Sequence, residues 1–465
     1  MKLSQDQLIT SYEIFLKNKI QETEQNIKPN QLLSFCFDLP DDFWGDNLPF
    51  LLKESKDGFY SCSNNEEILA IGNIFSIESE GIKRWNKIEE QFNKFPGQFF
   101  NSEETKFTDL PLFIAAIKFN DKKQSDEWSD FRNLEFYIPK FLIKTESENL
   151  ICRFNVIITS AFSIDNSIVE FSNTLTKFFN VFHEDEETFN YKSNFDLIEE
   201  KIAWKVKIEK ALSAIKNNSF SKIVLARKFS LETDRPIPVE LLPGRLKKAN
   251  PFANIFFIKK NDSAFLGASP EILIELKNQV IRTEAIAGSR KRGTTLEEDQ
   301  QFADDLFNSD KERAEHNSVV NFLVANLTSL AKDVQYEKIP SIKKLTSIQH
   351  LFTEITAKLQ SGSSFFSIVD KIFPTPAVCG YPKESAMRLI SELEDFDRGL
   401  YAGLIGWVSP SSAKLIVAIR SALIKKNTIF VYAGCGIVEG SDPESEFAET
   451  ETKFKTILSA FNEKN

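Results

Sequence analysis

The chain has 465 residues, a formal net charge of −10 and a pI near 5.2. Its 42% hydrophobic and 27% charged residues are typical of a soluble globular protein, long enough for one large core or for two or three domains. An acidic chain is a poor partner for a phosphate backbone, so we expect no nucleic-acid partner.

The two halves of the chain differ in the sharpness of their patterns. The first half, to about residue 195, mixes short helix and strand patterns without a catalytic constellation, and the sequence shows no internal repeat. The second half predicts a helix, a strand, a hairpin, a long helix broken near residues 308–309, and a second hairpin, over residues 195–218, 221–231, 263–289, 296–330 and 414–438. Strand runs interleaved with helices predict an α+β protein with large antiparallel sheets.

An acidic stretch near the C-terminus predicts the last helix. Ser441-Asp442-Pro443 supplies a capping residue and an early proline, which mark a helix start. At about 100° per residue, Glu446, Glu449 and Lys453 then fall within one arc of roughly 60°. Two carboxylates and an ammonium should therefore share one strip beside the apolar face of this helix.

A second acidic pair lies on the predicted helix 296–330. Glu312 and Glu315 are also three residues apart. Two helices that each carry two carboxylates one turn apart could share one hard cation, and Mg²⁺ commonly uses one or two carboxylates together with substrate oxygens. The alternative is two solvated acidic helices, because this spacing is common.

Three charged residues lie in or beside predicted strands. Lys222 opens the strand at 221–231, where an inward-facing lysine would be desolvated and so favour its neutral, basic form. Glu271 follows a Gly and a Pro at a strand start, where burial would favour a protonated carboxyl and a general acid. Arg420 interrupts an apolar strand and needs a partner, for which an anionic ligand is one candidate. The alternatives are a lysine at a strand edge and a glutamate in a turn.

Glycines at predicted strand ends suggest backbone contacts to an anion. Gly288, Ser289 and Gly434 lie at such ends, where N–H groups can face an anionic group. The neighbouring residues 290–292, Arg-Lys-Arg, predict a solvated basic loop.

Cysteine usage indicates the compartment. The five cysteines are odd in number and widely spaced, without a C-x-x-C motif: Cys36, Cys62, Cys152, Cys379 and Cys435. This pattern predicts reduced thiols in the cytoplasm and excludes a disulfide framework or a zinc site. We expect no membrane association, because the N-terminus lacks the apolar run of a signal peptide and no stretch of about 18 uncharged apolar residues occurs.

Several motifs of the second half occur in the order found in one enzyme family. They are SKIVLAR, GASPEILI, AIAGSRKRG, ERAEHNSVVNFL, SIQHLFTEI, FPTPAVCGYPKESA, LEDFDRGLYAGLIGW, IVAIRSALI and YAGCGIVEGSDPESEFAETETKF. Over residues 195–460 the chain resembles the chorismate-utilising enzymes, and within them isochorismate synthase. The resemblance implies a single large domain of antiparallel sheets packed face to face with outer helices. Residues 1–195 would form an N-terminal part of the same unit, and residues 196–465 the chorismate-binding catalytic region.

The resemblance also implies roles for individual residues. Glu315 and Glu449 would bind Mg²⁺, with Glu312 and Glu446 supporting it through waters. Lys222 would activate a water for attack on ring carbon 2, and Glu271 would protonate the hydroxyl leaving ring carbon 4. The substrate would be held by Arg420, Lys453, His350 and the backbone at Gly288, Ser289 and Gly434.

The expected activity is Mg²⁺-dependent conversion of chorismate to isochorismate by a monomer. Aminating members of the family work with a glutamine amidotransferase subunit, which we do not expect for this chain because Ala287 stands where aminodeoxychorismate synthases have lysine. The alternatives are a salicylate synthase that also eliminates pyruvate, and a non-catalytic binding homologue. The pathway is open between menaquinone, siderophore and salicylate synthesis, with menaquinone the commoner use.

Overall fold

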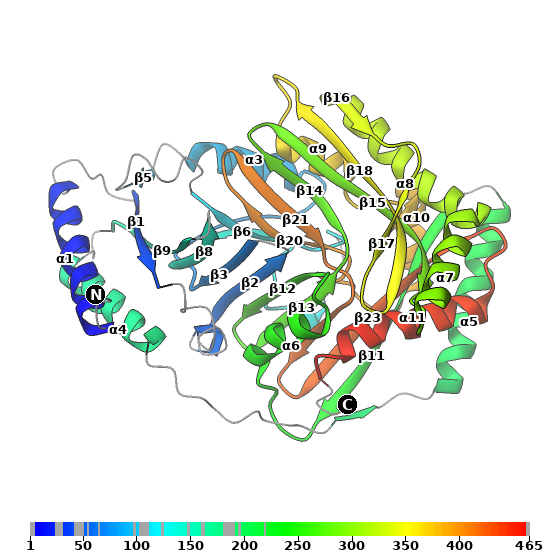
Figure 1. Ribbon diagram of the computed structural model, residues 1–465, viewed down its shortest axis with the longest axis horizontal. Helices are drawn as coiled ribbons and strands as arrows, with labels where there is room; N and C mark the ends of the chain where they lie inside the picture. The colour runs from blue at the N-terminus through cyan, green and yellow to red at the C-terminus, as the bar shows by residue number, and fades with distance from the viewer. Residues whose placement is uncertain are drawn as a thin grey trace.

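Two antiparallel β-sheets form the body of the protein (Figure 1). The computed structural model describes residues 5–23, 31–40, 51–53, 55–63, 66–95, 99–101, 111–121, 125–146, 149–159, 163–179, 191–193, 197–217 and 220–461. Within these residues the larger sheet has 13 strands and the smaller sheet has 10. The pairing is antiparallel throughout, except where β1 meets β5.

Each sheet is described by the order of its strands from one edge to the other. The larger sheet contains β10 (Tyr191–Ser193), β11 (Lys222–Thr233), β23 (Thr428–Val438), β22 (Ser421–Lys425), β13 (Ser263–Ser269), β12 (Asn254–Lys260), β2 (Asp57–Ser63), β3 (Glu66–Ile71), β8 (Phe141–Glu146), β9 (Asn149–Ile157), β1 (Leu32–Leu39) and β5 (Phe99–Asn101), with β19 (Gly380–Tyr381) beside β11. The smaller sheet contains β16 (Ala331–Tyr336), β18 (Ile348–Leu359), β15 (Val280–Lys291), β14 (Ile272–Lys277), β21 (Ser412–Val417), β20 (Leu404–Val408), β6 (Phe113–Ile117), β7 (Leu134–Ile138) and β4 (Phe75–Ser79), with β17 (Ser341–Lys344) beside β18.

Helices flank the sheets. They are α1 (Gln5–Thr23), α3 (Arg84–Lys94), α4 (Ile164–Phe179), α5 (Leu197–Lys216), α6 (Leu242–Ala249), α7 (Leu296–Asn308), α8 (Asp310–Thr328), α9 (Phe365–Ile372), α10 (Lys383–Leu393) and α11 (Pro443–Leu458). The long helix expected over 296–330 is broken at Ser309, where the sequence predicted a break, and the Ser309 side chain caps α8. None of the described helices combines the length and the apolar composition needed to cross a membrane.

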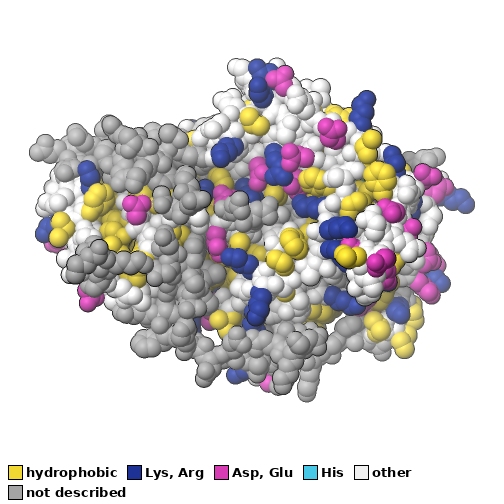
Figure 2. All heavy atoms as spheres, viewed as in Figure 1, with side chains coloured by type: hydrophobic (Ala, Val, Ile, Leu, Met, Phe, Trp, Pro, Cys, Tyr) yellow, Lys and Arg dark blue, Asp and Glu magenta, His cyan; other side chains and the backbone are white. Residues whose placement is uncertain are grey.

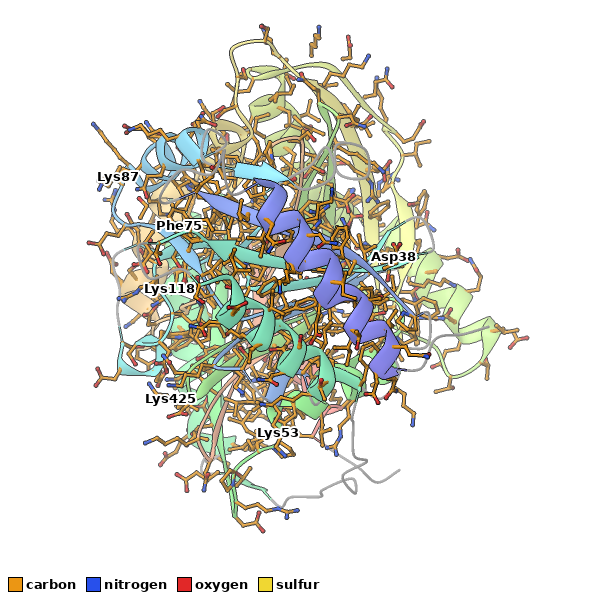
Figure 3. The ribbon with its side chains drawn as sticks, turned by 90° about the vertical axis from the view of Figure 1, so that its left-hand side faces the viewer. Asp38, Lys53, Phe75, Lys87, Lys118 and Lys425 are labelled. Atoms are coloured by element: carbon orange, nitrogen blue, oxygen red, sulfur yellow. The ribbon has the colours of Figure 1, made fainter. Side chains whose placement is uncertain are left out.

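The core has two layers, one on each face of the larger sheet. Successive side chains of a strand point to opposite faces, so Phe256 and Ile258 of β12 enter the layer between the sheets, whereas Ile255 and Phe257 enter the outer layer. The outer layer is closed by α1, α4, α6 and α11. In Figure 3, α1 and α4 lie side by side over this face. The predicted face-to-face packing of antiparallel sheets is confirmed.

The two halves of the chain repeat one topology. In the first half, β2, β3, β8, β9 and β1 are adjacent in that order, and in the second half β12, β13, β22, β23 and β11 are adjacent in the same order. The smaller sheet likewise contains β6-β7-β4 and β20-β21-β14. The halves meet where β12 pairs with β2 and β20 pairs with β6, so both sheets contain strands from both halves. The duplication lies in the strand order, whereas the sequence itself shows no internal repeat.

Two predicted strands cross between the sheets. The run 263–276 was predicted as one arm of a hairpin, but it breaks at Pro270-Glu271, where β13 of the larger sheet gives way to β14 of the smaller sheet. The run 414–424 breaks in the same way before Arg420, between β21 and β22. The corners are joined by hydrogen bonds from Val417 N to Glu271 O (3.1 Å) and from Ala268 N to Arg420 O (3.2 Å). Glu271 and Arg420 therefore lie at neighbouring corners where the sheets part.

Candidate active site

One pocket collects the predicted site residues. It has an empty volume of about 890 Å³, part of which is open to solvent. Of the predicted residues, its walls contain Glu271, Gly288, Ser289, Glu312, Glu315, His350, Arg420, Gly434, Glu446, Glu449 and Lys453. Lys222 is not a wall residue, but its Nζ lies 2.7 Å from Glu315 Oε1. Residues from both sheets and from the helices α8 and α11 thus meet in one place.

Helices α8 and α11 direct their carboxylates into this pocket. Each begins with a side-chain cap: Ser309 accepts from Glu312 N, and Asp442 accepts from Ser445 N, of which only the cap of α11 was predicted from the sequence. Each capped helix presents residues three apart on the same side, which places both members of each acidic pair at the pocket. The predicted arc of Glu446, Glu449 and Lys453 faces the pocket.

Each of the four carboxylates is paired with a different cation of the protein. Glu315 binds Lys222 (2.7 Å), and Glu449 binds Lys453 (2.7 Å). The other two pairs are Glu312 with Arg290 (2.7 Å) and Glu446 with Lys311 (3.6 Å). The acidic pocket is therefore neutralised by the chain's own basic side chains.

This pairing decides how the pocket could accept a metal ion. Among the described residues no three acidic, histidine or cysteine side chains are close enough together to form a ready-made metal site. The donor set nevertheless fits a hard divalent cation, since four carboxylates from two helices line one wall. Burial acts to raise the pKa of Glu315, but the ammonium group of Lys222 outweighs it and the pKa is lowered, which keeps this carboxylate ionised. A metal ion would have to displace the paired cations.

Lys222 points inward, as predicted, and only 2% of its surface is exposed. It opens β11 opposite Val438 of β23. A Cβ at Gly436 would lie 3.0 Å from both Lys222 Cε and Glu315 Oε1. The glycine thus leaves the space in which the lysine and the glutamate meet.

Glu271 is the buried acid of the pocket. It is 2% exposed, and its Oε1 has no hydrogen-bond partner among the described residues. Burial, and next the charge of Glu284, raise its pKa to about 8. The carboxyl is therefore protonated at neutral pH and can donate a proton to a group bound in the pocket.

His350 and Arg420 form a fixed hydrogen-bonded unit. Arg420 Nη2 donates to His350 Nε2 (2.6 Å), so His350 carries its proton on Nδ1, which lies 3.1 Å from Gly288 O. Burial and the Arg420 charge hold the pKa of His350 well below its usual value, so the ring is neutral. Burial also lowers the pKa of Arg420 to about 10, which leaves it charged at neutral pH. Within the described part of the chain Arg420 has no ion-pair partner, which favours an anionic ligand.

Several expectations about the backbone of the site are wrong. Gly288 and Gly434 lie inside β15 and β23, not at strand ends. Gly288 has φ +76° at a β-bulge, a conformation that favours glycine. The bulge turns Ser289 N toward Glu312 Oε2 (3.1 Å), and Gly434 O accepts from Lys453 Nζ (2.8 Å), so these groups serve the protein's own charges.

The basic segment 290–292 is not a solvated loop. Arg290 and Lys291 belong to β15, and Arg290 pairs with Glu312. Arg292 pairs with Asp299 of α7 at 2.6 Å. Local sequence patterns could not reveal these partners, because the acids lie on helices that fold back onto the strand.

Sequence reasoning also missed four residues in or behind the pocket. Tyr401 and Lys311 line it, and Glu284 with Lys343 lies behind Glu271. Lys311 directly precedes the motif ERAEHNSVVNFL, and Glu284 directly precedes the motif AIAGSRKRG. A charged residue directly before a recognised motif was the signal available for both.

Comparison with known proteins identifies the family of the chain. The model of the family described as chorismate binding enzyme matches residues 18–462. The isochorismate synthase MenF of Bacillus subtilis is 32% identical over 414 residues, 86% of this chain and 87% of that protein. The anthranilate synthase component 1 of Aquifex aeolicus is 33% identical over 289 residues, which are 61% of this chain and 57% of that protein.

Solved structures show the same fold. The menaquinone-specific isochorismate synthase MenF from Escherichia coli superposes with a TM-score of 0.80 at 22% identity, covering 97% of this chain and all of that one. Anthranilate synthase component I from Streptococcus pneumoniae gives a TM-score of 0.67 at 23% identity, over 85% of this chain and 92% of that one. The chain belongs to the family of chorismate binding enzymes.

Proposed function

We propose that the protein is an isochorismate synthase that isomerises chorismate to isochorismate. The observation that carries the proposal is the buried Glu271 carboxyl, whose raised pKa keeps it protonated at neutral pH. Its Oε1 has no hydrogen-bond partner among the described residues. It shares the pocket with Glu315, which binds the Lys222 ammonium. An acid and a base at one pocket suit a displacement in which one hydroxyl enters as another leaves.

The proposed reaction needs one proton transfer at each end. Lys222, which is paired with Glu315 at 2.7 Å, would have to give up its own proton before it takes one from a water that attacks ring carbon 2 as the double bond shifts. Glu271 gives its proton to the hydroxyl that leaves ring carbon 4. One water is consumed and one released, so the reaction is an isomerisation.

Mg²⁺ is part of the proposal. Glu315 and Glu449 would hold the ion, with Glu312 and Glu446 behind it. When bound, Mg²⁺ supplies a positive charge that holds a substrate carboxylate in place. Arg420 and Lys453 would bind carboxylate oxygens, and neutral His350 would keep the Arg420 guanidinium oriented.

The activities of the relatives support this proposal. MenF of Bacillus subtilis is an isochorismate synthase, and so is DhbC of the same species, 32% identical over 286 residues. The salicylate biosynthesis isochorismate synthase of Pseudomonas aeruginosa matches 57% of this chain at 33% identity. We propose a menaquinone role, a monomer without an amidotransferase subunit, and a cytoplasmic location, which is consistent with five free thiols.

A product assay tests the proposal. The purified protein is incubated with chorismate and Mg²⁺, and the products are separated by chromatography. Isochorismate is expected. Salicylate and pyruvate as main products would identify a salicylate synthase, and an ammonia-dependent product would identify an aminating enzyme. No turnover by folded, Mg²⁺-loaded protein would support a non-catalytic homologue.

A further inference from the structure

Behind Glu271 lies a buried carboxylate to which the proposed mechanism gives no task. Glu284 of β15 is 3% exposed, and it receives two cations. Arg282 Nη2 lies 2.9 Å from Glu284 Oε1, and Lys343 Nζ lies 2.9 Å from Glu284 Oε2. Removing a carboxylate from water is costly, so a position of this kind needs a physical reason.

The contacts of Glu284 hold the corner that carries Glu271. The backbone pairing of β14 with β15 ends at Glu275, which leaves the first residues of β14 without ladder partners on that side. Ile272 N, directly after Glu271, donates to Glu284 Oε2 (3.4 Å). Lys343, held by the same carboxylate, donates to Pro270 O (2.8 Å), directly before Glu271. Glu284 thus ties down the chain on both sides of the acid.

The charge of Glu284 also acts on Glu271. After burial, it is the largest influence that raises the pKa of Glu271. The other charged groups facing Glu271 are cations: Lys222 of β11, Lys343 of β17 and Arg420 of the neighbouring corner. A negative neighbour favours the protonated carboxyl, whereas these cations favour the ionised form. Glu284 is therefore the one carboxylate among them that opposes ionisation of the acid.

We propose that Glu284 is a positioning residue for Glu271, which both anchors the corner at Pro270 and Ile272 and keeps the acid protonated. Its catalytic consequence rests on the proposed function, but the coupling between the two carboxylates does not.

Opposite charge changes around Glu271 test the proposal. Glu284→Gln removes the negative charge and keeps an acceptor for Ile272 N, so the titration midpoint of Glu271 should fall by about one pH unit or more, a tenfold change in its ionisation constant. Lys343→Met removes a facing cation and should move the midpoint upward. The matched control is Glu354→Gln, because Glu354 also pairs with Arg282 but its side chain is exposed to solvent. It should leave the midpoint unchanged.

The readout does not depend on turnover. The carbonyl stretch of protonated Glu271 is followed against pH by infrared difference spectroscopy, with Glu271→Gln as the reference. Equal midpoints in Glu284→Gln and the parent would overturn the proposal, as would a shift of the same sign in Glu284→Gln and Lys343→Met. Should Glu284→Gln not fold, Lys343→Met alone decides, and a midpoint that is unchanged or lower would refute the electrostatic coupling.

Activity gives the second readout. The upper pH limb of kcat should move downward in Glu284→Gln, and Glu284→Asp should restore the limb while kcat stays reduced, since the shorter side chain keeps the charge but reaches the corner poorly. A loss of kcat that is equal at every pH would indicate a structural role only. A parent enzyme that does not convert chorismate would refute the proposed function and leave the infrared result standing.

Discussion

Helices α4 and α11 occupy equivalent places in the two halves, and only α11 faces a pocket of acidic residues within the described part of the chain. Each comes after the last strand of its half, β9 or β23, and each packs against the helix that precedes the first strand, α1 or α5. Glu170 of α4 pairs at the surface with Lys140, which lies at the corner between β7 and β8. The corresponding corner in the second half carries Arg420, which is 5% exposed and lines the pocket.

The difference arises in the segment between β14 and β20. In the second half this segment contains β15 to β19 and α7 to α10. Among the residues that line the pocket, Gly288, Ser289, Glu312, Glu315 and His350 come from this stretch. Figure 1 shows α8, β15 and β18 on the same side of the molecule as α11, away from α1 and α4. The duplicated strands thus supply the corners of the site. The segment between β14 and β20, together with α11, supplies the acidic residues of the pocket.

The difference between the two halves is not visible in the distribution of charges on the face shown in Figure 2. Acidic and basic side chains are interspersed over the described part of the face in Figure 2. The carboxylates that distinguish the halves are turned inward, where cations of the chain neutralise them.

Replacing the proposed base should have the largest effect. Lys222→Ala should reduce isochorismate formation about 10³-fold while the fold is retained, because general-base catalysis contributes about 10²–10⁴-fold. The measurement is kcat for chorismate, with circular dichroism as the folding check. Lys140→Ala, at the first-half corner, should leave kcat unchanged. Retained isochorismate formation by Lys222→Ala would refute its role as base.

Replacing one acid on α11 should come next. Glu449→Ala should lose both Mg²⁺ binding, measured by titration calorimetry, and about 10²-fold in activity, the lower end of what a positioned charge contributes. It also leaves Lys453 without its 2.7 Å partner. Glu170→Ala on α4 is the matched control and should change neither quantity. Full activity of Glu449→Ala at ordinary Mg²⁺ concentrations would mean that the acidic face of α11 has no metal role.

The buried acid should reduce stability at high pH. The pKa of Glu271 is about 8 in the folded protein against an ordinary value of 4.5, so folding requires proton uptake between these pH values. A raised carboxyl pKa gives stability that is fully present below about pH 4.5 and lost as pH rises through about 8. The free energy of unfolding of Glu271→Gln should therefore exceed that of the parent by about 4 kcal/mol at pH 8, and the difference should vanish near pH 4.5. Denaturant titrations at both pH values measure it, and a pH-independent difference would contradict the raised pKa.

Local features of the site were predictable, and long-range features were not. The arc of Glu446, Glu449 and Lys453 follows from helical geometry within two turns or so. The sheet switch at Pro270-Glu271 was missed, because the apolar run continues through it and periodicity does not report which sheet a strand joins. The pairing of Lys222 with Glu315 spans 93 positions and depends on the packing of α8 against the strands. The roles of these two residues were suggested by family resemblance, and their contact by the structure.

The smallest effect separates two acids of α11 that lie outside the pocket. Glu444 and Glu451 lie outside the arc of Glu446, Glu449 and Lys453, and Glu444 is exposed. Glu451 instead pairs at 2.7 Å with Arg227, whose side chain is 4% exposed and whose guanidinium stacks on Phe447. Removing the partner of a buried cation costs more than removing a surface charge, so Glu451→Ala should destabilise the fold by about 1 kcal/mol and Glu444→Ala by less than about 0.5 kcal/mol. Neither should change kcat. Equal unfolding midpoints for the two variants would show that Glu200, 3.8 Å from Arg227 Nε, and the Thr450 hydroxyl, 2.7 Å from Arg227 Nη1, satisfy the guanidinium without Glu451.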